Sequence, residues 1–308
     1  MITTIPIKNE KDIAVPDKTV LVLGYFDGVH KGHQKLFEIA TKASMKDYLP
    51  VVVMTFTESP KLALQPYHPD LMLHIVNPQE REQKLKWNGV EALFLLDFSS
   101  KFASLTAQEF FDTYIKALKP TIIVAGFDYT FGSDNKTADD LKDYFDGEII
   151  IVPPVEDEKG KISSTRIRQA ILDGNVKEVS HLLGNPLPSR GMVVHGNARG
   201  RTIGYPTANL VLKDRTYMPA DGVYVVDIEV QRQKYRGMAS VGKNVTFDGE
   251  ESRFEVNIFD FSDDIYGETV TVYWLDRVRG MVKFESVEEL VDQLEKDEEI
   301  ARNWKTED

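Results

Sequence analysis

Three glycines and two histidines fall within the ten residues GYFDGVHKGH near the start of the chain. Gly24, Gly28 and Gly32 permit a tight turn and let a ligand approach main-chain N–H groups. His30 and His33 are three residues apart, so they can share one side of a first helical turn and donate hydrogen bonds to phosphate oxygens. The pattern therefore suits a reaction in which negative charge grows on phosphorus.

Simpler interpretations of this segment stay open. Glycine-rich turns between strands and helices are common, and a single histidine is more often structural than catalytic. A metal site built on His30 and His33 lacks a third ligand at suitable spacing. The glycine order matches neither the dinucleotide-binding GxGxxG nor the phosphate loop GxxxxGK[ST].

A second polar segment, ISSTRIR, lies at 162–168. Ser163, Ser164 and Thr165 offer hydroxyl and amide groups at a predicted helix N-terminus, and Arg168 adds positive charge. This arrangement predicts a further element that faces phosphate, although an ordinary helix cap explains it equally well.

A third polar segment, HGNARGRTIGYPTAN, lies at 195–209. Its glycines permit a loop over phosphates, its arginines can offset phosphate charge, and a proline stiffens its exit: Gly196, Gly200, Gly204, Arg199, Arg201 and Pro206. Thr207 and Asn209 are two residues apart at a strand start, so their oxygens project to one side, where Mg²⁺ could sit. Farther on, Glu255 alternates with apolar residues, and without context a solvent-facing carboxylate is the simpler interpretation.

Two different patterns of predicted secondary structure must position these residues, and the first is an alternation of strands and helices. Predicted strands at 19–23, 51–56, 90–96, 121–125 and 148–152 alternate with predicted helices at 32–46, 79–88, 107–118, 138–145, 165–173 and 176–183. A capping box at 106–109 and Gly89, Gly174 and Gly184 mark helix ends. The alternation predicts an α/β doubly wound parallel sheet that binds ligands beyond the carboxyl ends of its strands.

The second pattern is a run of strands, which begins after a predicted connector at 185–190 that contains two prolines. Strands are predicted at 191–195, 208–212, 222–230, 234–241, 254–261 and 268–275. They suit a small antiparallel β-barrel, followed by a C-terminal helix that a capping box at 286–289 opens. We therefore expect two domains, at 1–184 and 185–308.

Composition limits the partners. The 308 residues include no cysteine, which excludes disulfides and thiolate metal sites and agrees with a cytoplasmic location. No apolar run is long enough to cross a bilayer, so we expect no membrane partner. The formal net charge of −12 argues against binding to nucleic acid, while local cations can still hold a small anion. The oligomeric state stays open.

The motifs resemble a known family when taken together. GxFDGxHxGH, GxDxxFG and ISSTxIR, in this order, resemble the adenylyltransferase domain of the bifunctional prokaryotic riboflavin kinase/FAD synthetase family. HGxxxGRxxGxPTAN, DGVY at 221–224 and ExxxFDF at 255–261 are similar to the riboflavin kinase domain of the same family. The resemblance implies a transferase that uses Mg²⁺ and ATP to convert riboflavin to FMN, and FMN to FAD with release of pyrophosphate.

The resemblance also implies roles for single residues. Catalytic roles fall on His30, His33 and Glu255, with Glu255 as the base, and a magnesium-binding role falls on Thr207 and Asn209. Contacts to ATP or its phosphates are implied for Gly24, Phe26, Asp27, Gly28, Gly32, Ser163, Ser164, Thr165, Arg168, Gly196, Arg199, Gly200, Arg201, Gly204 and Pro206. Contacts to the flavin in the adenylyltransferase domain are implied for Gly126, Asp128, Phe131 and Gly132.

Five positions depart from the usual pattern of the family, and one of them is Val245, which replaces the proline of a usual PTF sequence. Tyr25 replaces an asparagine, and Ser59 replaces the histidine of a Pro-His-Pro sequence. Asn257 replaces a histidine, and Met281 stands where an acidic residue is typical. Two alternatives therefore stay open: an enzyme that keeps one of the two steps, or a flavin or nucleotide sensor without turnover.

Overall fold

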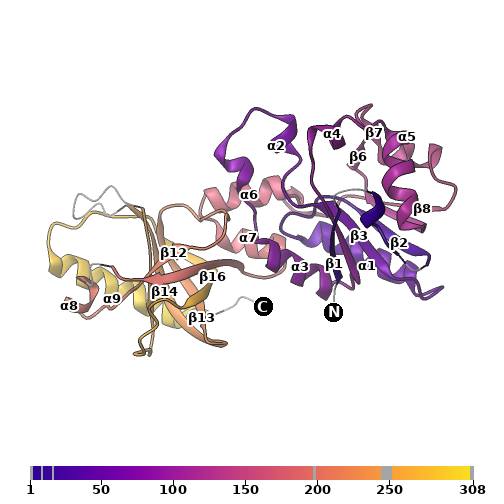
Figure 1. Ribbon diagram of the computed structural model, residues 1–308. Coiled ribbons are helices and arrows are strands. Elements are labelled where there is room, and N and C mark those ends of the chain that lie inside the picture. The colour runs from indigo at the N-terminus through magenta and orange to yellow at the C-terminus, as the bar shows by residue number, and fades with distance from the viewer. Residues whose placement is uncertain (1–2, 8–9, 16, 197–198, 244–251, 306–308) are drawn as a thin grey trace. The chain divides into compact units, whose positions relative to one another are not determined.

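The computed structural model describes residues 3–7, 10–15, 17–196, 199–243 and 252–305 (Figure 1). The chain divides into two compact units, Met1–Ser164 and Thr165–Asp308. The side chains of 10, 199, 243 and 252 also lie outside the description.

A six-stranded parallel sheet forms the centre of the first unit. Its strands run in the order β1-β4-β3-β2-β5-β8, and every neighbouring pair is parallel. Their bounds are β1 Thr3–Ile7, β2 Thr19–Leu23, β3 Val51–Phe56, β4 Ala92–Leu96, β5 Pro120–Gly126 and β8 Glu148–Val152. The predicted doubly wound sheet is confirmed. The edge strand β1 was not predicted.

Helices and short hairpins connect these strands. The helices are η1 Glu10–Asp12, α1 Lys31–Ser44, α2 Lys61–Leu64, η2 Pro69–Met72, α3 Pro78–Trp87, α4 Ser100–Ala103, α5 Ala107–Phe110, η3 Phe111–Ile115, η4 Lys116–Leu118 and η5 Ala138–Asp143. The hairpins are β6 Thr130–Phe131 with β7 Lys136–Thr137, and β9 Glu156–Asp157 with β10 Gly160–Lys161.

Two of the predicted helices are not regular α-helices. The predicted helix at 107–118 is one α-helical turn, a π-helical segment and a 3₁₀ turn, and the one at 138–145 is a 3₁₀ helix. The capping box at Thr106 and Glu109 forms as predicted, so the start of the first helix was read correctly. Phe110 and Phe111 are both buried and belong to the core cluster of this unit, so tertiary packing overrides the local α-helical preference here.

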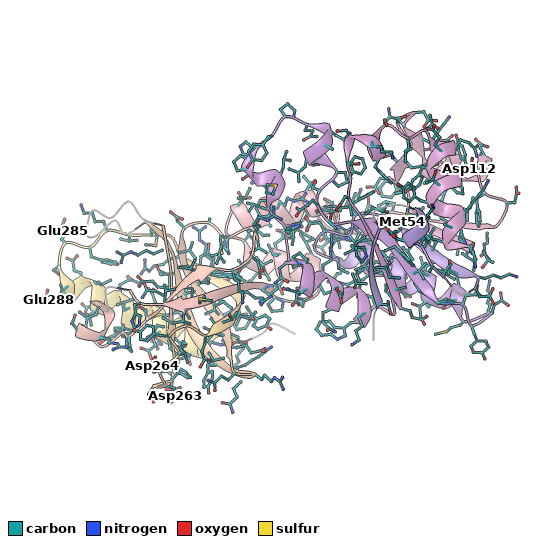
Figure 2. All side chains as sticks on the ribbon, viewed as in Figure 1. Met54, Asp112, Asp263, Asp264, Glu285 and Glu288 are labelled. Atoms are coloured by element: carbon teal, nitrogen blue, oxygen red, sulfur yellow. The ribbon has the colours of Figure 1, made fainter. Side chains whose placement is uncertain are left out.

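Side-chain alternation builds a core on each face of the sheet. Leu21 and Leu23 pack on one face with residues of α5 and η3, whereas Val20 and Val22 pack on the other face with residues of α1 and α3. Met54 of β3 lies inside the first of these cores (Figure 2). Since β2 is buried on both faces, the residues that follow it have a rigid base.

The second unit contains a closed six-stranded barrel in the order β11-β12-β15-β14-β13-β16. All its described strand pairs are antiparallel, so the predicted barrel is confirmed. The strands are β11 Leu187–Val194, β12 Ala208–Leu212, β13 Gly222–Val230, β14 Gln233–Lys243, β15 Ser252–Ile258 and β16 Thr269–Arg279. The helices of the unit are α6 Ser164–Leu172, α7 Val176–Leu183, α8 Arg199–Thr202 and α9 Val287–Asn303.

The predicted connector at 185–190 was wrong in part, because β11 already begins at Leu187. Pro188 pairs with Tyr273 of β16, whereas pairing with β12 starts only at Gly191. The missing N–H of Pro188 therefore costs no ladder bond to β12, as is usual for proline near a strand start. The compact units divide twenty residues before the predicted boundary at 184, and a division of the activities there stays a prediction.

Helix α9 lies along the barrel (Figure 1) and is held by a buried ion pair. Asp297 of α9 is fully buried and accepts hydrogen bonds from Nε and Nη2 of Arg279 at 2.9 and 2.7 Å, and from Gln293 at 2.9 Å. One of the two bonds of the predicted capping box forms, because the Ser286 hydroxyl accepts from the N–H of Glu289. In place of the second bond, the Glu289 carboxylate accepts from the N–H of Glu285. Within the described residues, no helix has the length and apolarity to cross a membrane.

We expect Asp297→Asn to lower the free energy of unfolding of this unit by about 3–5 kcal/mol, because it leaves the Arg279 guanidinium without its buried partner. Guanidinium denaturation followed by tryptophan fluorescence measures the change. The matched control is Asp260→Asn, which breaks an exposed pair with Arg302 and should leave the unfolding midpoint almost unchanged. Equal midpoints for the two variants would contradict this role of Asp297.

Candidate active sites

The turn between β2 and α1 lies where the sheet reverses its direction of winding. From β2 the chain proceeds to β3 and β4 on one side and later to β5 and β8 on the other. In sheets of this kind, ligands bind beyond the carboxyl ends of the strands at such a reversal. Residues 24–30 follow β2, and Gly126 ends β5, so both predicted segments lie at the expected edge.

The turn itself has a strained backbone. Phe26 and Val29 have positive φ angles of 58° and 48°, and Gly28 has 82°. A left-handed conformation costs a residue with a side chain about 1–2 kcal/mol. The Phe26 ring folds back over Gly24, where an added Cβ would meet it at 2.6 Å. Gly24 is therefore required for packing, and the open approach to a ligand remains a prediction.

Hydrogen bonds from four separate segments of the chain hold this turn in place. Thr55 Oγ1 donates to the carbonyl of Tyr25 at 2.8 Å, and the N–H of Ile75 donates to the Asp27 carboxylate at 3.0 Å. Ser164 Oγ donates to the carbonyl of Asp27 at 3.1 Å, and Gln34 Nε2 donates to that of Val29 at 2.9 Å. Asp27 is 3% exposed, so its carboxylate shapes the turn from inside the unit.

His30 and His33 come together as predicted. Their rings stack with centroids 3.6 Å apart, and His30 caps α1 because its Nδ1 accepts from the N–H of His33 at 3.3 Å. Gly32 lies against the His30 ring. Desolvation, with the charges of His30 and Lys161 as smaller causes, holds the pKa of His33 well below its ordinary value. The Nδ1 atom of His33 is buried without a hydrogen-bond partner in the described part of the chain.

Lys161 is a charged residue of this region that the sequence analysis missed. It ends the β9–β10 hairpin, pairs with Asp128 at 2.5 Å and lies 4.4 Å from the ring centroid of Phe127. Its charge also contributes, as the smallest cause, to the lowered pKa of His33. The available signal was its position directly before ISSTRIR. Within that motif, Ser163 and Ser164 belong to the first unit, whereas Thr165 and Arg168 lie in α6 of the second.

The four residues implied in flavin binding lie in different settings. Gly126 ends β5, and Asp128 is an exposed partner of Lys161. Phe131 is 6% exposed in the core with other aromatic residues, and an added Cβ on Gly132 would meet the backbone of Ala107 at 2.5 Å. Packing explains Phe131 and Gly132 without a ligand, and flavin contact stays a prediction for all four.

The departures at Tyr25 and Ser59 adjoin a buried arginine. Arg81 of α3 is 4% exposed, donates through Nη2 to the carbonyl of Phe56 at 3.1 Å and has its Cζ 5.8 Å from the Tyr25 ring centroid. Burial lowers the pKa of Arg81, while Tyr25, Asp27 and Glu58 oppose this shift. Ser59 lies next to Glu58, whose carboxylate is 3.3 Å from Nε2 of the buried His74. Tyr25 thus packs on a cation absent from the motif.

In the barrel, Thr207, Asn209 and Glu255 come together as predicted. Asn209 of β12 lies directly opposite Glu255 of β15, and Thr207 Oγ1 donates to Glu255 Oε2 at 3.2 Å. Arg253, which the sequence analysis missed, has Nη1 3.5 Å from Glu255 Oε1. The Glu255 side chain is 26% exposed and paired at both oxygens, so it is only partly open to solvent, and its role as a base stays a prediction.

The glycine-containing loop lies beside these residues. An added Cβ on Gly196 would meet the Asn209 amide at 2.3 Å, so any larger residue there would displace that amide. Arg201 Nη2 donates to the Tyr266 hydroxyl at 3.3 Å, and His195 stacks on the Tyr266 ring at 3.7 Å. Gly200 begins a turn closed by the bond from the N–H of Tyr205 to its carbonyl, and Gly204 has a positive φ angle. The Arg199 side chain, predicted to offset phosphate charge, lies outside the described residues.

Asn257 and Met281, two barrel positions that depart from the family pattern, lie near Glu255, whereas Val245 lies outside the described residues. Asn257 Nδ2 donates to the carbonyl of Pro206 at 2.6 Å. Ser240, opposite Glu255 on β14, has its hydroxyl 4.0 Å from Met281 Sδ. On the barrel rim, Asp264 accepts from the N–H of Tyr266 at 3.2 Å and lies near Asp263 (Figure 2).

The described residues contain no cluster of three histidine, cysteine, aspartate or glutamate side chains that could bind a metal ion by themselves. The donors in the barrel are a hydroxyl, an amide and a carboxylate. Hard oxygen donors of this kind fit Mg²⁺, which keeps waters and takes its other ligands from substrate phosphates. The chemistry of this donor set therefore agrees with a nucleotide-bound magnesium ion.

Two family models match the chain. A model described as FAD synthetase matches residues 12–166, and one described as riboflavin kinase matches 183–305. The curated protein "Bifunctional riboflavin kinase/FMN adenylyltransferase" of Listeria monocytogenes is 39% identical over 287 residues, with 92% of this chain and 91% of its own covered. The protein of the same name from Bacillus subtilis is 38% identical over 292 residues, with 92% of each chain covered.

A solved structure is also similar. A crystal structure from Streptococcus pneumoniae, named a macrolide-efflux protein, has 80% sequence identity and a TM-score of 0.95, and the match covers 99% of this chain and all of that one. Its name describes a different activity from that of the curated relatives and of both family models. Those models and relatives agree with each other and with the motifs over both units. The chain belongs to the family of bifunctional riboflavin kinase/FMN adenylyltransferases.

Proposed function

We propose that Glu255 is the base of the riboflavin kinase reaction in the barrel. The observation that carries this assignment is the bond between Thr207 Oγ1 and Glu255 Oε2, which joins the carboxylate to the motif PTAN. In the reaction, the terminal ribityl hydroxyl of riboflavin attacks the γ-phosphorus of ATP and ADP leaves. Glu255 accepts the hydroxyl proton as the new O–P bond forms.

The oxygen atoms of Thr207 and Asn209 would hold Mg²⁺ with the phosphates of ATP. The bound ion neutralises phosphate charge during transfer. The pairing of Asn209 with Glu255 on neighbouring strands and the hydrogen bond from Thr207 to Glu255 support this role. The close approach of Gly196 to Asn209 supports a loop that would cover the nucleotide.

The first unit carries out the second reaction, in which a phosphate oxygen of FMN attacks the α-phosphorus of ATP and pyrophosphate leaves. This transfer needs no covalent intermediate, so positioning and charge stabilisation account for catalysis. The stacked histidines at the N-terminus of α1, with the charge of Lys161 nearby, support this assignment. Helix N-termini favour anions through their free N–H groups and dipole.

Hydrogen bonding fixes how His30 can act. Because its Nδ1 accepts from the N–H of His33, a neutral His30 carries its proton on Nε2. That Nε2–H is then a donor for a phosphate oxygen. The lowered pKa keeps His33 neutral near pH 7, so the two stacked rings avoid a repulsion between two charges.

The chain is a transferase that phosphorylates riboflavin to FMN and adenylylates FMN to FAD, since each family model matches one activity and the curated relatives are named for both. No observation favours a single retained step or a sensor without turnover. The lack of cysteine and the bacterial relatives support a cytoplasmic enzyme, and the net charge of −12 supports small-molecule partners rather than nucleic acid.

We expect Glu255→Gln to slow FMN formation by about 10²- to 10⁴-fold, because the amide cannot accept the hydroxyl proton. The purified variant is incubated with riboflavin, Mg²⁺ and ATP, and the flavins are separated by chromatography. FAD formation from supplied FMN is the internal control and should stay within about twofold of wild type. A kinase rate near that of wild type would refute the assignment.

His30→Ala should have the opposite effect, with severe loss of FAD formation from FMN and normal riboflavin phosphorylation, because it removes the Nε2–H donor and the cap of α1. The same chromatographic assay measures both rates. His68→Ala, an exposed histidine of the same unit, serves as the control. Equal loss of both activities in His30→Ala would indicate a purely structural residue.

We expect the free energy of unfolding to fall less steeply with decreasing pH in His33→Gln than in the wild type. The unfolded chain protonates His33 near pH 6.5, whereas the folded chain does so only at lower pH, so the stability contribution is present above pH 6.5 and is lost as the pH falls. Denaturation midpoints at pH 5 to 8 measure this slope, which one proton limits to about 1.4 kcal/mol per pH unit. The exposed His68→Gln should keep the wild-type slope, and a wild-type slope in His33→Gln would contradict the argument.

A further inference from the structure

Strand β15 presents three polar side chains toward the same side: Arg253, Glu255 and Asn257. The alternate residues Phe254 and Val256 are buried, and Phe254 stacks on Trp274 at 5.3 Å. The polar side of β15 is therefore held in place by the packing of its apolar side. Asn257 is only 8% exposed, so its amide must find partners within the protein.

Asn257 meets the neighbouring chain where the strand ladder stops. Pairing between β12 and β15 begins at Ala208 opposite Val256, so Pro206 and Thr207 precede it. Asn257 Nδ2 donates to the Pro206 carbonyl at 2.6 Å. The next residue, Thr207, donates from Oγ1 to Glu255 Oε2 at 3.2 Å. Two side chains of β15 thus fix two consecutive residues of the motif PTAN.

We propose that Asn257 is a positioning residue for phosphoryl transfer, which rests on the roles proposed above for Glu255 and Thr207. Its amide holds the Pro206 carbonyl and thereby orients the Thr207 hydroxyl toward both Glu255 and the nucleotide-bound metal. Asn257 itself touches neither reacting atom. The departure from histidine at this position keeps an N–H donor, which is the feature that the Pro206 carbonyl requires.

Asn257→Asp tests the proposal because it keeps the shape and replaces the N–H donor with an oxygen that faces the Pro206 carbonyl. We expect kcat for FMN formation to fall about tenfold and the Mg²⁺ concentration at half-maximal rate to rise severalfold. FAD formation from FMN should stay within about twofold. Asn257→His restores a donor and should recover kcat and the Mg²⁺ dependence to within about threefold of wild type.

Asn185→Asp is the matched control, since Asn185 Nδ2 also donates to a proline carbonyl, that of Pro186 at 3.0 Å, in the same unit. It should leave both rates and the Mg²⁺ dependence unchanged. Thermal melting of each variant monitors the fold. A merely structural role of Asn257 predicts that melting temperature and kcat fall together while the Mg²⁺ dependence stays fixed.

Three results would overturn the inference: a wild-type Mg²⁺ dependence in Asn257→Asp, equal loss in Asn257→His and Asn257→Asp, or loss of activity that only follows melting. If Asn257→Asp fails to fold, Asn257→His alone decides, because the proposal requires it to be active. Failure here differs from failure of the proposed function. An inactive Glu255→Gln with a fully active Asn257→Asp refutes only this inference, whereas an active Glu255→Gln refutes the proposed base.

Discussion

The parallel pairing of β2 between β3 and β5 is the constraint on which the first unit depends. It buries β2 on both faces and brings the ends of three strands to one edge. The turn that follows β2 contains non-glycine residues at positive φ, a conformation that persists only where the surroundings enforce it. Hydrogen bonds from β3, from α1 and from Ser164 supply that enforcement. The rigid strand pairing and the strained turn that follows it form one edge of the sheet, and we propose that ATP phosphates bind at this edge.

The barrel reaches a comparable result with antiparallel register. Because Asn209 lies opposite Glu255, a strand pair rather than a turn brings the polar groups together. Closure of the barrel leaves no free edge among its strands, and α9 is fixed to it through Asp297. Neither unit relies on net charge, which is strongly negative overall. Each uses a few groups with fixed positions, which suits phosphate transfer without a covalent intermediate.

The departures from the family pattern lie in local settings that explain how the chain tolerates them. Tyr25 packs over the buried Arg81, and Asn257 uses its amide on the Pro206 carbonyl. The sulfur of Met281 lies 4.0 Å from the hydroxyl of Ser240. These residues sit at the margins of the sites, while the histidine pair and Glu255 keep the residue types of the motifs. The match of both family models to the chain agrees with this pattern.

The sequence by itself determined the fold class, the barrel, most strands and the residues that gather at each site, because periodicity, glycine turns and motif spacing are local properties. It did not determine β1, the π-helical segment at Phe111–Ile115 or the early start of β11, since packing and long-range pairing decide these elements. Only the tertiary structure identified Lys161 as a charge near the histidine pair and Arg253 as a partner of Glu255. It also assigned Phe131 a place in the core, because a buried ring and a ligand-facing ring look the same in a linear motif.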